Sequence, residues 1–336
     1  MEEKARAIGL FSGGLDSIIA ASLVMEQGIE VELVNFTTVF FDRAFKESVM
    51  ASAQKAADGI GKPLTVIDLS NEFFSVLKDP AYGYGSAMNP CIDCRIFMLK
   101  KAKGYMAERG ASFVFTGEVL GQRPFSQRRD AMRIIERESG LKGFLLRPLS
   151  ARLMSPTVAE EKGIIDRSKL LSVSGRSRKP QMALAKRFGI EEYPASGGGC
   201  VLTEKEFAVK LRDLMNHEPD FDAGDIELLK HGRHFRISPA SKLVVGRDAQ
   251  ENYRIASLAR KDDVMFHARD PLGPVCLLRG ADPGSTFEEA MSILARYALG
   301  KGNEGTASIR CFSGRGEERF LSARPCKESF VEDKRI

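Results

Sequence analysis

Short apolar runs, each with the length of a buried strand, recur through the first half of the chain. They cover residues 5–11, 31–36, 63–69 and 112–116. Stretches with the apolar spacing of a helix follow them: residues 16–27, a segment that ends at Gly61, residues 95–109 and residues 179–189. Strands that alternate with helices at this spacing predict βαβ units, and therefore an α/β fold with a doubly wound parallel sheet.

The pattern changes after the glycine-rich stretch ASGGG at 195–199. A strand is predicted at 242–245, a helix up to Arg260 and a strand at 264–268. These shorter elements predict a smaller α+β domain. We therefore expect two domains, residues 1–204 and residues 205–336.

The turn between the first strand and the first helix reads SGGLDS, residues 12–17. Glycines let the backbone approach a ligand closely, and the unpaired amides and dipole of a helix N-terminus favour phosphate. The hydroxyls of Ser12 and Ser17 add donors, and Asp16 is a candidate ligand for Mg²⁺. The chain has neither the GxxxxGK[ST] nor the GxGxxG pattern. The alternative is an ordinary strand-to-helix turn.

Three of the six cysteines lie in contexts that suggest chemistry. Cys91 and Cys94 form a CxxC at the start of a helix, where the dipole is expected to lower a thiol pKa. Cys200 follows the glycine stretch. Half of a structural zinc site is an alternative for the CxxC, but all four histidines lie beyond Cys200 and no second CxxC completes the site. Three thiolates can instead hold a [4Fe–4S] cluster, or one cysteine can carry a persulfide that another resolves.

Composition is that of a globular protein, with 43% hydrophobic and 28% charged residues. No apolar run approaches the length of a membrane span or of a secretory signal, so we expect a cytoplasmic protein. The net charge of +5 is uneven, because residues 123–187 hold 16 basic and 6 acidic residues. This segment predicts a polyanionic partner, with a merely solvated basic surface as the alternative.

The SGGLDS turn resembles the PP-loop, SGGxDS, of the ATP pyrophosphatase families. All five fixed positions match: Ser12, Gly13, Gly14, Asp16 and Ser17. The order PP-loop, NPCxxC (89–94), TGE (116–118) and a distant single cysteine is similar to the tRNA thiouridine synthetases, especially their 2-thiouridylase branch. The motif LLRPLS at 145–150 and the segment KPQMALAKRFGI at 179–190 strengthen this likeness. The resemblance covers about residues 6–204 and implies a Rossmann-like sheet.

The resemblance also implies roles for individual residues. The five PP-loop residues would hold the pyrophosphate of ATP, while Asn35, Phe36 and Gly117 would border the nucleotide. Cys91, Cys94 and Cys200 would deliver sulfur, with or without an iron–sulfur cluster. The basic residues predicted to contact the RNA backbone are Arg123, Arg128, Arg129, Arg176, Arg178 and Lys179. For Asn35, Phe36 and Gly117, plain sheet-end geometry is the alternative.

Residues 242–280 have a likeness of their own, to the NFACT-R module, an RNA-binding domain. The matching positions are Gly246, Arg247, Asn252, Asp262, Phe266, His267, Ala268, Arg269 and Gly273. Residues 205–336 hold 22 basic and 21 acidic residues, so any RNA contact must be local. We expect Arg247, His267 and Arg269 to make it, with a buried core histidine as the alternative for His267.

These observations predict an ATP-dependent RNA sulfurtransferase, with tRNA as the expected RNA. A base carbonyl oxygen, expected to be that of a uridine, would attack the α-phosphate, and sulfur from an unidentified donor would then displace AMP. Two alternatives stay open: a PP-loop amidase or ligase that uses ammonia or an amine, and an RNA-binding factor that only senses the nucleotide.

Overall fold

The computed structural model describes residues 4–41, 43–193, 200–268, 273–280, 285–300, 302–313 and 318–336. It divides the chain into two compact units, Met1–Thr203 and Glu204–Ile336. Each unit has its own sheet and its own hydrophobic core.

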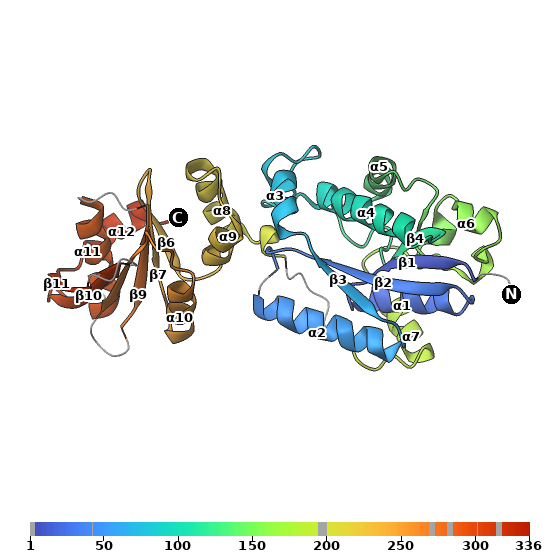
Figure 1. The fold of residues 1–336 in the computed structure, drawn as a ribbon, viewed down its shortest axis with the longest axis horizontal. Coiled ribbons are helices and arrows are strands. Elements are labelled where there is room, and N and C mark those ends of the chain that lie inside the picture. Colours follow the sequence, from blue (N-terminus) through green and yellow to red (C-terminus); the bar gives the residue numbers. More distant parts are fainter. Residues whose placement is uncertain are drawn as a thin grey trace. The chain divides into compact units, whose positions relative to one another are not determined.

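The first unit contains a five-stranded sheet in which every pair of neighbours is parallel. Its strands are β1 (Arg6–Leu10), β2 (Glu30–Thr37), β3 (Leu64–Asp68), β4 (Phe113–Thr116) and β5 (Leu145–Leu146). They lie in the order β3-β2-β1-β4-β5, so β1 has β2 on one side and β4 on the other (Figure 1). The chain therefore winds outward in both directions from β1, which makes the carboxyl ends of β1 and β4 the expected ligand crevice.

Helices cover both faces of this sheet. They are α1 (Leu15–Met25), α2 (Arg43–Gly59), α3 (Ser70–Lys78), α4 (Cys91–Glu108), α5 (Arg129–Ser139), α6 (Val158–Glu161) and α7 (Lys179–Arg187). One core cluster packs Ile19 of α1 and Ala185 of α7 with Phe113 and Phe115. The other packs Leu99 of α4 and Ile135 of α5 with Ile8 and Val114. Apolar side chains on both faces of β1 and β4 confirm the predicted doubly wound, Rossmann-like sheet.

The predicted strands and helices of this unit are present, with shifts at their ends. The CxxC helix begins at Cys91, four residues before the predicted start at Arg95. The sequence analysis did not predict α3 or α5. Helix α5 (RDAMRIIERES) lies in the basic segment, where charged residues outnumber the few apolar residues that it buries, such as Met132 and Ile135.

The second unit has a six-stranded antiparallel sheet in the order β11-β10-β8-β9-β7-β6. Its strands are β6 (Arg233–Ser238), β7 (Ser241–Val245), β8 (Val264–Ala268), β9 (Val275–Arg279), β10 (Ala307–Ser313) and β11 (Glu318–Ala323). Its helices are α8 (Lys205–His217), α9 (Ala223–Leu229), α10 (Ala249–Ser257), α11 (Ser285–Leu299) and α12 (Glu328–Lys334). This arrangement confirms the predicted α+β architecture.

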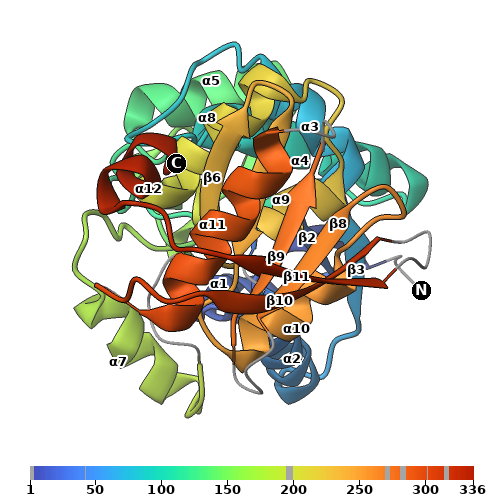
Figure 2. The same ribbon diagram turned by 90° about the vertical axis from the view of Figure 1, so that its left-hand side faces the viewer.

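The two faces of this second sheet are covered to different extents. Helix α11 packs over one face and contributes Ile293 and Leu294 to the main core, and Figure 2 shows it lying across the strands. A smaller cluster joins Ile255 of α10 to Val244 and Leu277 on the other face. Within the described residues, no helix is long and apolar enough to cross a membrane.

Candidate active site

The SGGLDS turn begins where β1 ends, and the neighbouring strand β2 holds it in place. The amide of Phe11 donates to the Val34 carbonyl at 2.8 Å. Asn35, at the end of β2, donates from Nδ2 to the Phe11 carbonyl at 2.7 Å. Asn35 therefore positions the turn, whereas the side chain of Phe36 is buried in the core.

Helix α1 starts without a side-chain cap. Its N-cap residue is Gly14, in an extended conformation, and no side chain accepts a hydrogen bond there. Gly14 itself accepts the amides of Ser17 and Ile18 at 2.9 and 3.1 Å through its carbonyl. An uncapped helix N-terminus leaves backbone donors and the positive end of the dipole available to an anion. The geometry is that of a phosphate cradle.

Two glycines make this cradle sterically possible. Gly13 has φ of +72°, and a Cβ atom there would lie 2.4 Å from the Cα of Ala53 in α2. Gly117, directly after β4, lies against the start of α1, because a Cβ atom there would be 2.5 Å from the Ser17 nitrogen. The carboxyl end of β4 thus closes on the head of α1, and any side chain at either glycine would push the turn apart.

The polar side chains of the turn face one another. Ser17 Oγ donates to the Gly14 carbonyl at 2.8 Å and lies 3.4 Å from Ser12 Oγ. Asp16 Oδ2 accepts a hydrogen bond from Gln122 Nε2 at 3.1 Å. The other Asp16 oxygen, Oδ1, is buried without a hydrogen-bond partner among the described residues. A carboxylate oxygen with an unused acceptor site at a phosphate cradle fits Mg²⁺ coordination.

The CxxC lies at the head of α4. Cys91 is the first residue of the helix and Cys94 lies one turn further on. Asn89, which is 6% exposed, donates from Nδ2 to the Cys91 sulfur at 3.2 Å. Its Oδ1 accepts the amide of Ala87 at 3.1 Å, so the same side chain fixes the loop that precedes the helix.

Backbone contacts fix the position of the segment that carries Cys200. It forms an antiparallel bridge with Phe41, a few residues beyond β2. Two hydrogen bonds fix the following residues: the Val201 amide donates to the Phe40 carbonyl at 3.0 Å, and the Met88 amide donates to the Leu202 carbonyl at 3.1 Å. The segment that carries Cys200 therefore lies between the end of β2 and the loop that leads into the CxxC.

Burial determines the protonation state of Cys94. Burial raises the pKa of Cys94 to about 12, Arg95 acts in the opposite direction, and the charges of Cys200 and Cys91 raise it further. The expectation that the helix dipole lowers the thiol pKa is therefore wrong for Cys94, because desolvation of the sulfur outweighs the dipole. At neutral pH Cys94 is a thiol.

A cluster-binding arrangement is not preassembled. Among the described residues, no group of three or more His, Cys, Asp or Glu side chains could hold a metal ion. Three soft thiol donors suit an iron–sulfur cluster chemically, but their geometry in this structure does not form a ligand set. The predicted cluster therefore stays a prediction.

A buried network of ion pairs holds the helix that carries the CxxC in place. Glu118, 3% exposed, accepts from Arg147 Nε at 3.1 Å and lies 3.4 Å from Arg95 Nε. Arg147 also pairs with Glu136 of α5. Burial alone would raise the pKa of Glu118, but the positive charges of Arg147 and Arg95 hold it below its usual value. The network fixes Arg95, and with it the turn of α4 that carries Cys94.

The charges of Asp16, in the phosphate cradle, and of Cys91, in the CxxC, both act on Arg123. The surrounding protein lowers the pKa of Arg123, as does the charge of Arg95, while Cys91, Glu118 and Asp16 act in the opposite direction. The side chain nevertheless keeps solvent access. Glu118 lies two residues beyond the end of β4 and contacts Arg95 of α4, and Gly117 packs on the start of α1, so the start of α4 and the phosphate cradle both lie at the carboxyl end of β4.

The other predicted RNA contacts lie on two neighbouring loops and on the first residues of the helices that follow them, α5 and α7. Arg128 is the N-cap of α5, and Arg129 donates to the Leu153 carbonyl at 2.9 Å. The second loop runs up to α7 and presents Arg176 and Lys179 as exposed side chains and Arg178 as the N-cap residue. A parallel bridge between Leu120 and Ser174 joins this loop to the one that carries Arg123. The basic residues therefore lie near one another, beside the end of β4.

In the second unit, the predicted RNA residues have mixed surroundings. Arg247 is paired with Glu251, with both nitrogen–oxygen distances from Nε at 2.9 Å. His267 is partly buried on β8, so it is not a fully buried core histidine. Arg269 lies outside the described residues. Several positions of the NFACT-R likeness are structural: Phe266 is fully buried, and a Cβ atom at Gly246 would lie 2.1 Å from Asn252 Oδ1.

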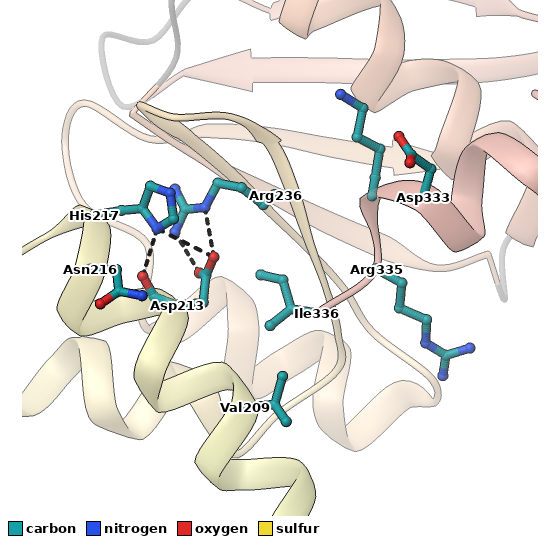
Figure 3. A pocket seen from close by; sticks show the side chains of 9 residues that line it. Val209, Asp213, Asn216, His217, Arg236, Asp333, Arg335 and Ile336 are labelled. Atoms are coloured by element: carbon teal, nitrogen blue, oxygen red, sulfur yellow. Dashed lines mark hydrogen bonds and ion pairs between the residues drawn. The ribbon is translucent and has the colours of Figure 1, made fainter.

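A recess in the second unit also brings charged side chains together, but these side chains neutralise one another (Figure 3). Asp213 of α8 accepts from Arg236 Nη2 at 2.6 Å and from Nε at 3.1 Å. His217 lies 3.4 Å from the same carboxylate. Burial would raise the pKa of Asp213, but the Arg236 hydrogen bond and the charge of Lys242 hold it low. We interpret this cluster as the anchor of α8 on β6.

Sequence reasoning missed several residues of the first site. Gln122, Asn89, Arg95, Glu118 and Arg147 all contact or orient the predicted residues. Asn89 and Glu118 lie inside the motifs NPCxxC and TGE, so their place in a motif was a usable signal. Arg147 likewise lies inside the motif LLRPLS, but its pairing with Glu118 was not predicted because it depends on the meeting of β4 and β5.

Comparisons with known proteins agree with this geometry. Residues 3–155 match the family model described as thiamine biosynthesis protein (ThiI), and residues 232–334 match the NFACT protein RNA binding domain. The first match lies within the first unit, and the second match lies within the second unit. This confirms both resemblances inferred from the residues.

Individual relatives cover parts of the chain. A tRNA-specific 2-thiouridylase of Sulfurimonas denitrificans is 34% identical over 113 residues, 32% of this chain and 33% of that protein. Its counterpart in Stutzerimonas stutzeri is 25% identical over 241 residues, 69% of this chain and 61% of that protein. The chain thus spans between a third and about three fifths of the length of these relatives.

Among solved structures, a 4-thiouridine synthetase in complex with RNA and bound ATP is similar, with 22% identity and a TM-score of 0.36. The match covers 55% of this chain and 52% of that one. The U34-tRNA thiolase NcsA from Methanococcus maripaludis, solved with its [4Fe–4S] cluster, has 16% identity and a TM-score of 0.31. It covers 67% of this chain and 68% of that one.

Proposed function

We propose that the protein is an ATP-dependent RNA sulfurtransferase that acts on tRNA and replaces a carbonyl oxygen of a uridine with sulfur. The observation that carries the proposal is the meeting of two groups at one edge of the first sheet. One is the uncapped start of α1, with Ser12, Gly13 and Gly14 before it. The other is the set of thiols at positions 91, 94 and 200.

ATP binds with its phosphates on the cradle. The first amides of α1 and the hydroxyls of Ser12 and Ser17 donate to phosphate oxygens, and Gly13 and Gly117 allow the close approach. Asp16 holds Mg²⁺ through its unpartnered oxygen. When bound, that ion neutralises phosphate charge. Arg123 adds a positive charge on which the charges of both Asp16 and Cys91 act.

The reaction has two displacements. The uridine carbonyl oxygen attacks the α-phosphorus, the bond between the α-phosphorus and the bridging oxygen breaks, and pyrophosphate leaves. A sulfur nucleophile then attacks the activated carbon, and AMP leaves with the former carbonyl oxygen. The protein contributes mainly orientation and charge stabilisation to both steps.

Sulfur arrives as a persulfide on one cysteine, supplied by a donor of the persulfide class. After its terminal sulfur has attacked the carbon, a second cysteine attacks the sulfur that remains attached to the first. This releases the thiolated base and leaves a disulfide, which an external thiol reductant must reduce before the next turnover. The desolvated thiol of Cys94 is poorly ionised at neutral pH, which favours Cys91 or Cys200 as the carrier.

Turnover by cysteine variants tests the proposal. We expect Cys200→Ser to abolish thiolated nucleoside in the tRNA, measured by mass spectrometry, while ATP binding persists. The matched control is Cys326→Ser, a partly buried cysteine of the second unit, which should retain activity. Unchanged thiolation in Cys200→Ser would contradict the proposal, and AMP formation with ammonia but no sulfur product would favour amidation.

Anaerobic purification separates the two forms of sulfur delivery. The persulfide route predicts iron well below one equivalent per chain and activity that survives iron chelation. A stoichiometric iron content with a charge-transfer absorption band that is lost in Cys91→Ser, Cys94→Ser and Cys200→Ser would instead establish a three-cysteine cluster.

A further inference from the structure

Part of the second sheet has an open face. Along β10, Ala307, Ile309 and Cys311 are buried, while Ser308 and Arg310 between them are exposed. Along β11, Leu321 and Ala323 pack against the main core, while Phe320 and Ser322 are exposed. Because neighbouring residues in a strand point to opposite faces, α11 covers one side of this hairpin and the other side meets solvent.

The open side continues across the sheet as one row of residues. Phe320 pairs with Arg310, Arg310 pairs with His267, and His267 pairs with Val275, across β11, β10, β8 and β9. Residues directly opposite each other in paired strands share a face. An aromatic ring that is 57% exposed, a guanidinium group and a partly exposed imidazole are thus aligned.

The row ends at the loop that carries Arg247. The Gly246 amide donates to the Val275 carbonyl at 2.9 Å, and Asn252 Oδ1 accepts the Val275 amide at 3.0 Å. Arg247 follows Gly246, and its side chain is 52% exposed. Two of the three residues predicted from the sequence therefore lie along or at the end of the row that holds Arg310 and Phe320: His267 is part of the row, and Arg247 follows the glycine at its end.

Arg310, the cation in this row, can exchange its partner Glu318 for a phosphate. Arg310 Nη2 donates to Glu318 Oε2 at 3.1 Å, and both side chains are more than 40% exposed. Its guanidinium also lies 5.5 Å from the centre of the Phe312 ring. Exposed ion pairs contribute little to stability, so a phosphate can replace Glu318 at small cost while the ring keeps the guanidinium in place.

We propose that this open face of β8, β10 and β11 binds a single-stranded segment of the RNA substrate. It is formed by Phe320, Arg310, His267, Ser308 and Ser322. One base stacks on Phe320, and a backbone phosphate pairs with Arg310. An exposed ring on a flat sheet surface suits an unpaired base, and serine hydroxyls can bond 2′-hydroxyls or base edges. The inference rests on the proposed function for the identity of the RNA.

The test measures binding of the full chain to a short fluorescein-labelled oligouridylate at several salt concentrations. Phe320→Ala should weaken binding about tenfold, the loss of one stacked base, without changing the salt slope. Arg310→Ala should reduce the slope of log K against log salt by about 0.7, the loss of one phosphate contact to a single strand. The controls are Tyr253→Ala, an exposed ring on α10, and Arg319→Ala, next to Phe320 on the opposite side of β11.

Two results would overturn the proposal. One is wild-type affinity in both test variants with retained melting temperatures. The other is a change in oligomeric state in Phe320→Ala without a change in RNA affinity, which would show that protein covers this face. Binding does not require thiolation, so failure of the chemistry leaves this test intact.

Discussion

At the scale of single residues, the site depends on positions where no other side chain fits. Gly13 has a left-handed backbone conformation, and a Cβ atom there would collide with the Cα of Ala53. Gly117 packs directly on the start of α1. The SGGxDS motif made Gly13 predictable. The role of Gly117 was predicted only as a border of the nucleotide, because the contact between β4 and α1 arises from their packing and leaves no trace in local sequence.

Gly13→Ala should impair the phosphate cradle. Both Gly13 and Gly28 have positive φ, so alanine costs about 1–2 kcal/mol at each. Only at Gly13 does the new Cβ atom collide with a backbone, whereas nothing lies within 4 Å of Gly28. We expect AMP formation to fall about 100-fold in Gly13→Ala through displacement of the turn. Equal activity of Gly13→Ala and the control Gly28→Ala would show that the turn does not hold ATP.

Glu118→Gln should destabilise the first unit. Removing one partner from a buried ion pair costs about 3–5 kcal/mol, and Glu118 faces Arg147 and Arg95. Hydrogen exchange of β4 peptides, followed by mass spectrometry, measures the loss. The control is Glu26→Gln, which breaks an exposed pair with Arg187 and should cost less than about 1 kcal/mol.

The same carboxylate has a predictable pH dependence. Its pKa is lowered in the folded state, so its contribution to stability is present above the unfolded value, about pH 4.3, and is lost as the pH falls through the folded value. The stability difference between the wild type and Glu118→Gln should therefore be constant from pH 5 to pH 7 and shrink below about pH 4. A difference that grows with acidification would contradict the assigned charge.

At the scale of elements, the alternation of apolar runs was enough to predict the strands of the first sheet. Helix α5 was missed because its exposed arginines and glutamates hide a narrow buried stripe. In the second unit, the strand at 264–268 was predicted with its exact bounds, but the hairpin β10–β11 was not. Residues 307–311 alternate strictly between apolar and polar, but the exposed Phe320 interrupts the alternation in β11, so the two strands do not show the same pattern.

Asn252→Ala should loosen the link between α10 and the sheet. Asn252 donates to the Gly273 carbonyl at 3.3 Å and accepts the Val275 amide, and its loss leaves both groups without that partner. The expected cost is about 1–3 kcal/mol, visible as faster hydrogen exchange of the Val275 amide. Asn303→Ala, which removes a local bond to the Gly305 amide, is the control and should leave Val275 protected.

At the scale of the whole molecule, some basic residues form internal ion pairs and others stay exposed to solvent. The basic segment 123–187 predicted an anionic partner, but part of its charge is internal, since Arg147 is buried against Glu118 and Arg187 pairs with Glu26. Of the residues that stay exposed, Arg123, Arg128 and Arg176 lie on two loops joined by the bridge between Leu120 and Ser174, whereas others, such as Arg133 and Arg137, lie on α5. Composition therefore indicated the partner, whereas only the fold distinguishes structural arginines from available ones.

Arg128→Gln and Arg176→Gln should each reduce the salt dependence of tRNA binding. Each lost phosphate contact lowers the slope of log K against log salt by about 0.7–0.9. Arg187→Gln is the control from the same segment, because its guanidinium is bound to Glu26 with both nitrogen–oxygen distances at 3.1 Å. Equal slopes in all three variants would mean that these loops do not contact RNA.

The central claim is that Cys200 meets the CxxC beside the ATP cradle, and mild oxidation of the full chain tests it most directly. Peptide mapping after diamide treatment should find Cys200 linked to Cys91 or Cys94 within one chain, while Cys276 and Cys311, buried in the second unit, stay reduced. If Cys200 stays reduced or forms links only between chains while the protein remains folded, the three thiols do not form one site and the proposed sulfur transfer fails.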